Sequence, residues 1–503
     1  MDTEIELKFL VQGENVADNI RQCLTHHNFT FKEEEKTLKN TYFDTPDLKL
    51  RQLDYGLRIR TYSTFQEQTI KTRGQVVSGL HSRPEYNVEI SGSVPELALF
   101  PEQLWQDASQ CQLIQEQLTP LFDTHFVRQV FTVENIAGGS IELAYDSGSI
   151  SSNNGNEKIN EIELELLSGA RESLFLLAEK LFEFLPLRVG NVSKAARGYA
   201  LFHRRPIEPD LTPLSLIAVK PSDTLDSVFS KAISESLAQL HGLINAYTQR
   251  PRLIYLVKMT EMLAIMRHGF WMFEQALPAQ VLVLREQLSA FMQQFSWVDK
   301  ATYLNELTNK TGNFRRKIEY SEQLIEQLDL EQQALPEADS VIQILHSQSF
   351  NQLLLELLKL VLAIENNGVT VNPKNEKTFD VARACLDVHF QNLIPAMASQ
   401  TPLPVEQYLE RHKLVVRSLL TGCWFGNLFD KAARLEFRNP WLDIKQGISE
   451  LEVLWLLHQQ LLTLDTPEQK LLKWQSTKLS KLLVALESSR LNALEQQPYW
   501  LAD

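Results

Sequence analysis

Acidic and basic side chains recur at every second position in several short segments of the first 170 residues. In the segment at 4–9, Glu4, Glu6 and Lys8 alternate with Ile5, Leu7 and Phe9. Residues two apart in a β-strand lie on the same face, so each such segment has one ionic face and one apolar face. The other ionic faces hold Arg58 and Arg60; Thr69, Lys71 and Arg73; Glu85, Asn87 and Glu89; and Glu161, Glu163 and Glu165.

An amphipathic sheet with its polar side in water is the usual meaning of this alternation. Two features favour a ligand site instead. The polar faces are almost purely ionic, and whole strands carry one sign, although carboxylates in a row repel one another unless cations balance them. A closed barrel of about eight strands would place the acidic and basic faces around one cavity.

A cavity with both signs is suited to a polyanion that metal ions bridge to the carboxylates. Arginine guanidinium groups match phosphate oxygens in a bidentate manner, and carboxylates are natural ligands of Mg²⁺ or Mn²⁺. A bound metal activates water and holds phosphoryl oxygens, while basic walls stabilise charge during transfer. The pattern therefore predicts phosphate chemistry with a divalent metal.

The elements that position these residues are predicted to be antiparallel strands, because period-two alternation with intervening turn residues is typical of them. Amphipathic helices interrupt the strands at about 14–27, 101–119 and 170–185, and they would cover the outward apolar faces. The predicted strands are 4–11, 40–45, 56–62, 67–73, 83–90, 126–133, 140–148 and 159–167.

Beyond the proline-rich stretch at 204–223, the strand signal ends and helical stripes begin. Apolar residues from Phe350 to Leu362 recur at helical spacing, which predicts an all-helical bundle. Similar stripes occur near 224–246, 254–270, 278–296, 378–394, 406–425, 447–464 and 470–488. We predict a first domain at 1–205, a linker at 206–223 and a helical domain at 224–503.

The overall charge and the cysteines limit the classes of function. The formal net charge of −14 argues against a general nucleic-acid or anionic-membrane binder. Four scattered cysteines without a CxxC pair predict free thiols in a reducing compartment. The acidic start MDTEIELKFL does not fit a signal peptide, and the longest apolar runs are too short to span a bilayer. We therefore expect a cytoplasmic protein without membrane or nucleic-acid partners.

The ionic motifs, taken in order, resemble the CYTH superfamily, also called triphosphate tunnel metalloenzymes. The family start E-x-E-x-K corresponds to residues 4–8. The later motifs are YFDTP (42–46), LRIR (57–60), TIK (69–71), RPEY (83–86), Arg128 in FVRQ, Asp146 in AYDSG, IELELLSG (162–169) and SKAARGY (193–199). The phrases RPEYNV, ELELLSG and SKAARGY are similar to bacterial inorganic triphosphatases that carry a C-terminal CHAD domain.

The resemblance implies an α+β chain: an eight-stranded antiparallel β-barrel tunnel with flanking helices, then the all-α bundle. It implies hydrolysis of tripolyphosphate to pyrophosphate and phosphate with Mg²⁺ or Mn²⁺. Glu85 lies at a position linked to the site, and Lys8 and Tyr42 could form a proton-transfer pair, although Tyr42 could equally be a packed strand aromatic. The implied triphosphate ligands are Lys8, Arg58, Arg60, Lys71, Arg128, Lys194 and Arg197; the implied metal ligands are Glu4, Glu6, Asp146, Glu163 and Glu165.

The helical half resembles the CHAD domain, whose family is thought to bind polyphosphate-like anions. The segment 257–273 keeps Lys258, Arg267 and His268 of a basic family helix. Residues 206–503 nevertheless hold 28 basic and 34 acidic residues, whereas a strong polyphosphate-binding face needs clustered cations. Polyphosphate binding and a scaffold role both stay open for this domain.

Two other functions stay open for the tunnel. A non-catalytic polyphosphate or nucleotide sensor would need the cations but not the paired carboxylates. Thiamine triphosphatases and adenylate cyclases of the same superfamily share the triphosphate motifs. Retention of the whole carboxylate set favours catalysis.

Overall fold

The computed structural model describes residues 2–501 except 63–64, 78–79, 310–311, 313, 319–320 and 465–468. The chain divides into two compact units. The first comprises Met1–Pro209 and Ile342–Leu355, and the second comprises Asp210–Val341 and Glu356–Asp503. Each unit is described by itself.

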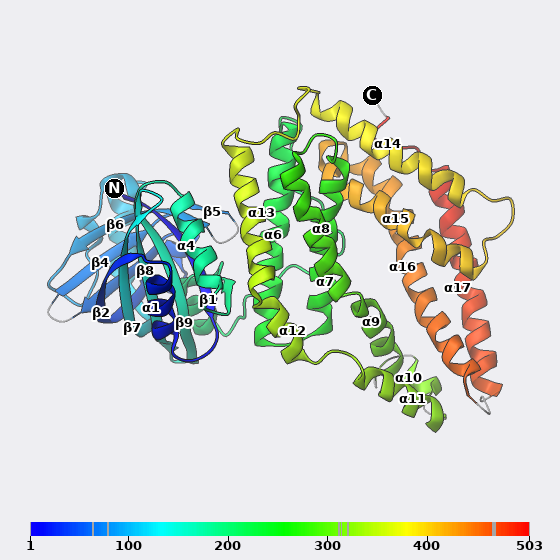
Figure 1. Ribbon diagram of the computed structural model, residues 1–503, viewed down its shortest axis with the longest axis horizontal. Helices are drawn as coiled ribbons and strands as arrows, with labels where there is room; N and C mark the ends of the chain where they lie inside the picture. The colour runs from blue at the N-terminus through cyan, green and yellow to red at the C-terminus, as the bar shows by residue number, and fades with distance from the viewer. Residues whose placement is uncertain are drawn as a thin grey trace. The chain divides into compact units, whose positions relative to one another are not determined.

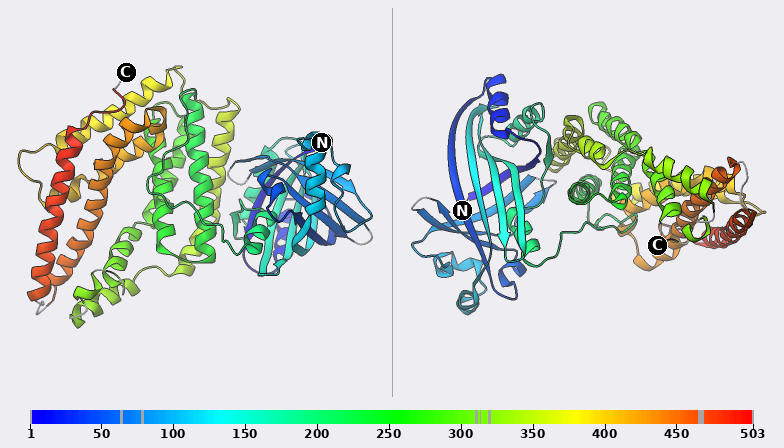
Figure 2. Two further views of the ribbon diagram at one scale, coloured as in Figure 1. Left: turned by 180° about the vertical axis from the view of Figure 1, so that it is seen from behind. Right: turned by 90° about the horizontal axis from the view of Figure 1, so that it is seen from below.

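The first unit is built on one antiparallel sheet that closes on itself (Figures 1 and 2). The strand order is β10-β1-β9-β8-β7-β2-β3-β4-β6-β5, and β1 also pairs with β6, so eight strands form a ring from β1 back to β1. The strands are β1 (Asp2–Val11), β2 (Thr30–Asp44), β3 (Gly56–Tyr62), β4 (Phe65–Lys71), β5 (Gln75–Val77), β6 (Leu80–Glu89), β7 (Thr119–Ile136), β8 (Gly139–Ser152), β9 (Gly155–Ser168) and β10 (Leu187–Val189). The predicted eight-stranded antiparallel barrel is confirmed.

The apolar faces of the strands point outward and are covered by helices, as predicted. Phe9 on β1 meets Phe182 edge to face, with ring centroids 5.5 Å apart, and both side chains are buried. Burying a side chain of this size contributes about 2–3 kcal/mol. The covering elements are α1 (Val16–His26), α2 (Lys49–Gln52), the 3₁₀ turns Leu97–Leu99 and Glu102–Leu104, α3 (Ala108–Gln117), α4 (Glu172–Phe182) and α5 (Lys194–Phe202).

Several predicted boundaries were wrong; the strand expected at 126–133 begins at Thr119, and the helix expected near 447–464 begins at Lys431. The helix expected at 101–119 begins only at Ala108, because the Asp107 side chain caps it by accepting from the Gln110 amide at 2.8 Å. The strand expected at 40–45 begins ten residues earlier, at Thr30. Its first half has little apolar alternation because residues 33–36 are exposed or half-exposed, yet its backbone pairs with β7 throughout.

The second unit is helical, as predicted. Two of its helices begin with side-chain caps, Thr224 before α6 and Asp430 before α16. In the described residues no helix is both long and apolar enough to cross a membrane. The remaining helices of the chain are α6 (Leu225–Gln249), α7 (Leu253–Met272), α8 (Ala279–Gln294), α9 (Trp297–Thr308), α10 (Arg315–Ile318), α11 (Glu322–Gln333), α12 (Ala338–Leu345), α13 (Gln348–Glu365), α14 (Thr378–Met397), α15 (Val405–Phe425), α16 (Lys431–Leu462) and α17 (Gln469–Glu495).

The segment predicted as a linker, 206–223, has no helix or strand, but its second half is packed rather than free. Leu214 and Ile217 are buried. The Leu214 carbonyl accepts from Arg438 at 2.7 Å, and the Ile217 amide donates to the Cys423 carbonyl at 3.0 Å. Residues from Asp210 onward therefore form part of the helical unit.

Candidate active site in the barrel

The ionic faces of the strands meet inside the barrel around a cavity of about 520 Å³. Most of the predicted site residues line it: Glu4, Glu6, Lys8, Tyr42, Arg58, Arg60, Lys71, Glu85, Arg128, Glu163, Glu165 and Lys194. The two others, Asp146 and Arg197, do not line it. Further charged or titratable side chains of the wall were not predicted as site residues: Arg51, Asp54, Tyr55, His81, Arg83, Glu142 and Tyr199.

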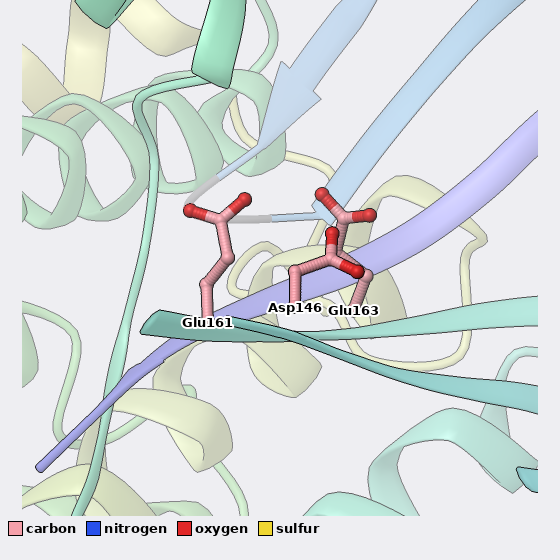
Figure 3. Close-up of side chains that lie close together, drawn as sticks. All are labelled: Asp146, Glu161 and Glu163. Carbon is pink, nitrogen blue, oxygen red and sulfur yellow. The ribbon is translucent and has the colours of Figure 1, made fainter. Parts of the chain in front are cut away.

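One part of the wall is a cluster of carboxylates that cations already neutralise. Asp146 on β8 and Glu161 and Glu163 on β9 lie side by side (Figure 3), with one oxygen from each within 4.8 Å of the others. We call these three residues the paired cluster. The Lys8 ammonium lies 2.8 Å from Glu161 and 2.9 Å from Glu163.

Helix α5 and β7 supply the other cations of the paired cluster. Lys194 lies 2.6 Å from Asp146 and 3.0 Å from Glu163, and it also contacts Glu161. Arg128 reaches Glu163 at 2.6 Å. Burial alone would raise the pKa of Glu161, but Lys194 and Lys8 lower it to about 2. Glu161 is therefore ionised and held by its cationic partners.

Arg197 and Asp146 both take part in this cluster from behind the cavity wall. The Arg197 guanidinium donates to Glu157 at 2.6 Å and to Glu161 at 2.9 Å. Asp146 is fully buried and accepts two hydrogen bonds from Arg128. In this structure each holds other site residues in place. Glu161 was missed as a site residue, although it shares the ionic face of Glu163 and Glu165.

A second part of the wall has more carboxylates than cations. Glu4, Glu6, Glu85, Glu142 and Glu165 line it, and we call these five residues the acidic group. Lys71 contacts Glu4 and lies 3.1 Å from Glu85. Burial, opposed by Lys71 and reinforced by neighbouring glutamates, raises the pKa of Glu4 to about 8. Burial and Glu142 raise the pKa of Glu165 to about 7.

Glu85 differs from the rest of the acidic group. Burial favours its neutral form, but Lys71 and Arg58 lower its pKa to about 2. Arg58 lies 3.3 Å from Glu85, and burial opposed by the nearby Tyr42 and Glu85 side chains leaves its pKa raised. Tyr42 stacks on Phe122, with centroids 4.7 Å apart. The Tyr42 side chain is thus both a packed strand aromatic and a part of the cavity wall.

A third part of the wall is formed by Arg60. Among the described residues, no carboxylate oxygen lies within 4.0 Å of a nitrogen of Arg60. Its Nε donates to Asn40 at 3.0 Å. Burial, Arg58 and Arg128 together lower the pKa of Arg60 to about 10, because a buried charge beside like charges is unfavourable. An anion at this position would relieve that strain.

Helix α5 is held against the barrel so that Lys194 reaches the cavity. The Ser193 hydroxyl caps the helix by accepting from the Ala196 amide at 3.1 Å. A Cβ at Gly198 would lie 2.0 Å from the Phe122 ring, so only glycine permits this close approach. The next residue, Tyr199, also binds the barrel, since its hydroxyl donates to Asp44 on β2 at 3.0 Å.

The fold and the site together define a closed antiparallel β-barrel with a cavity of mixed charge. Residues 2–199 match the model of the CYTH domain.

Comparison with known proteins covers only part of the chain. An inorganic triphosphatase of Haemophilus influenzae is 39% identical over 204 residues, which are 39% of this chain and 54% of that protein. The chain thus matches about half the length of this curated relative.

Among solved structures, a Hippeastrum protein described as a candidate adenylyl cyclase with a dominant triphosphatase activity matches 41% of this chain and 97% of its own, at 20% identity and a TM-score of 0.30. The CHAD domain of the plant Ricinus communis matches 58% of this chain and 98% of its own, at 13% identity and a TM-score of 0.40.

Proposed function

We propose that the barrel hydrolyses inorganic tripolyphosphate to pyrophosphate and phosphate with Mg²⁺ or Mn²⁺. The observation that carries this proposal is that one part of the cavity wall has an excess of positive charge and another part has an excess of carboxylates. Arg60 has no carboxylate partner among the described residues, whereas Glu4 and Glu165 are crowded by other carboxylates. In a metal–polyphosphate complex, the phosphate oxygens would bind Arg60 and the metal cation would bind the glutamates. The relative named inorganic triphosphatase supports the same substrate.

The proposed reaction transfers a terminal phosphoryl group to water. The water oxygen forms a bond to the terminal phosphorus, the bond from that phosphorus to the bridging oxygen breaks, and its electron pair leaves with pyrophosphate. One proton of the water is released. Arg58, Arg60 and Arg128 would bind the phosphate oxygens and stabilise their charge, and fixed cations in a dry cavity are effective in this role.

The acidic group fits a divalent cation. Burial and neighbouring carboxylates raise the pKa values of two of its members, Glu4 and Glu165, and oxygen donors of this kind suit Mg²⁺ or Mn²⁺. Glu4, Glu6 and Glu165, with Glu163 from the paired cluster, would hold the metal. When bound, the metal would lower the pKa of a coordinated water and neutralise phosphate charge. Asp146 was also predicted as a ligand, and it would enter only by exchanging Arg128.

The other predicted site residues have supporting roles in this proposal. Glu85 would keep Lys71 and Arg58 extended toward the phosphates. Lys194 would bind a phosphate oxygen once substrate competes with its carboxylate partners, and Arg197 would keep Glu161 ionised. Lys8 and Tyr42 are the proposed proton-transfer pair.

For the rest of the chain, we propose a catalytic domain at 1–205 and a CHAD-like domain at 224–503, joined by the segment 206–223, whose second half is packed into the helical unit. Polyphosphate binding by the helical domain and a cytoplasmic location stay predictions.

The test is phosphate release by the full chain from tripolyphosphate with Mg²⁺, with Mn²⁺ and with EDTA, beside ATP and thiamine triphosphate. We expect rapid, metal-dependent release from tripolyphosphate and little from the other two. Faster release from ATP or thiamine triphosphate would contradict the proposed substrate and assign that compound instead. Tight binding of tripolyphosphate without phosphate release from any of the three compounds would contradict the proposed hydrolysis and favour a non-catalytic sensor.

A further inference from the structure

A buried amide on β2 links two other strands of the barrel. Asn40 is 1% exposed, and its backbone is in register with Arg60 on β3 and Thr124 on β7. Its Nδ2 donates to Thr124 Oγ1 at 2.8 Å, and its Oδ1 accepts from Arg60 Nε at 3.0 Å. Arginine can only donate, so the amide oxygen must face Arg60 and the amide nitrogen must face Thr124.

Arg60 has a neutral hydrogen-bond partner, whereas the neighbouring arginines have carboxylate partners. Arg58 lies beside Glu85, and Arg128 lies beside Asp146 and Glu163. Asn40 fixes the plane of the Arg60 guanidinium through Nε and adds no charge. The two terminal nitrogens stay available for a bidentate contact, the geometry that suits a phosphoryl group.

We propose that Asn40, held by Thr124, is a positioning residue that presents Arg60 to the triphosphate as an oriented cation without a counter-charge. This inference rests on the proposed function and deepens it. The neutrality of residue 40 sets the affinity for the polyanion, since a carboxylate of the same shape would keep the orientation and cancel the charge.

The experiment compares four variants of the full chain. Asn40→Asp keeps the shape and adds a negative charge, Thr124→Val removes the acceptor that orients the amide, and Thr124→Ser restores it. Asn156→Asp makes the same chemical change at an exposed position of β9 and is the matched control. For each we would measure kcat and KM with Mg²⁺, tripolyphosphate binding by calorimetry in EDTA, and the thermal midpoint.

We expect Asn40→Asp to raise the KM or the dissociation constant at least about tenfold, the loss of one charge-assisted contact. We expect a smaller rise for Thr124→Val, recovery in Thr124→Ser and no change in Asn156→Asp. Affinity in Asn40→Asp within about twofold of the control, in a protein with an unchanged thermal midpoint, would overturn the inference. If Asn40→Asp does not fold, equal affinities of Thr124→Val and Thr124→Ser would overturn it.

The two proposals fail separately. Wild-type protein that binds tripolyphosphate without hydrolysing it contradicts the proposed reaction, while the calorimetric comparison still decides the role of Asn40. Wild-type protein that hydrolyses tripolyphosphate but shows no difference among the variants contradicts only the role of Asn40.

Discussion

Arg128 holds Asp146 through two parallel hydrogen bonds, from Nε to Oδ1 and from Nη2 to Oδ2, each 2.7 Å long. Both carboxylate oxygens are therefore engaged by one guanidinium. Lys194 adds a third contact at 2.6 Å. In this structure Asp146 therefore orients two cations of the site.

This geometry predicts the effect of Asp146→Asn. An amide accepts at one end only, so Arg128 would lose its bidentate partner and its fixed plane. We expect the KM for tripolyphosphate to rise about tenfold, with the half-saturating Mg²⁺ concentration within about twofold of the wild type. Kinetics at varied Mg²⁺ give both values. A large shift in the Mg²⁺ requirement at constant KM would instead make Asp146 a metal ligand.

For Glu4→Gln and Glu165→Gln in the acidic group, we expect the Mg²⁺ requirement to change rather than the affinity for tripolyphosphate. Each change would remove a proposed metal ligand without removing a phosphate ligand. We expect kcat/KM to fall about 100-fold, or about 2.7 kcal/mol in the barrier, with partial recovery at high Mg²⁺. Glu34→Gln is the matched control, because Glu34 lies on β2 with 63% of its side chain exposed. Normal activity in both site variants would contradict the metal assignment.

The faces of the strands could be predicted because alternation is a local property. Glu4, Glu6 and Lys8 had to share a face wherever β1 lay. The partner of Lys8 could not be predicted in this way. Glu161 is 153 positions away in sequence, and the two meet only because β1 pairs with β9 in a particular register.

Some site residues carry no signal in a single sequence. Asn40 is a neutral residue in a mostly polar stretch, and its role appears only when β3 and β7 flank β2. Asp146 and Arg197 have the residue types expected for ligands, yet tertiary pairing places them behind the cavity wall. The polar first half of β2 was missed because its partner strand, rather than its own pattern, makes it extended.

Tyr42→Phe would separate the two roles open for this residue. The change keeps the ring that stacks on Phe122 and removes the hydroxyl, which lies in the cavity wall with Arg58. If the hydroxyl takes part in proton transfer, we expect kcat to fall at least about tenfold and the pH profile of kcat to change. An unchanged kcat with an unchanged thermal midpoint would leave Tyr42 as a packed aromatic. Tyr62→Phe, at the end of β3, is a control for a tyrosine that does not line the cavity.

Residues 1–205 should fold alone and keep the activity. All of the proposed ligands lie in this range, and the ring of eight strands closes within it. We expect kcat/KM of the fragment within about threefold of the full chain, since no proposed ligand is lost. Circular dichroism and phosphate release check both points. A folded but inactive fragment would show that the helical half is needed for catalysis.

Acid should destabilise the helical unit through a buried histidine pair. His268 and His389 are 6% and 7% exposed, with ring centroids 5.2 Å apart. Burial, His389, Arg417 and Arg267 lower the pKa of His268 to about 3. Burial and Arg417 lower the pKa of His389 to about 4. Trp271 packs on both rings, and Thr421 hydrogen-bonds His268.

The sign follows from the ordinary histidine value of 6.5. Below pH 6.5 these histidines bind protons in the unfolded chain but stay neutral in the folded unit. Their contribution to the free energy of unfolding is therefore complete above pH 6.5 and decreases as the pH falls toward 4. Two pH units correspond to about 2–3 kcal/mol for each histidine. Urea unfolding followed by tryptophan fluorescence should show this slope, and His268→Gln with His389→Gln should flatten it. Exposed His203→Gln is the control, and an equal slope in the double variant would contradict the assignment.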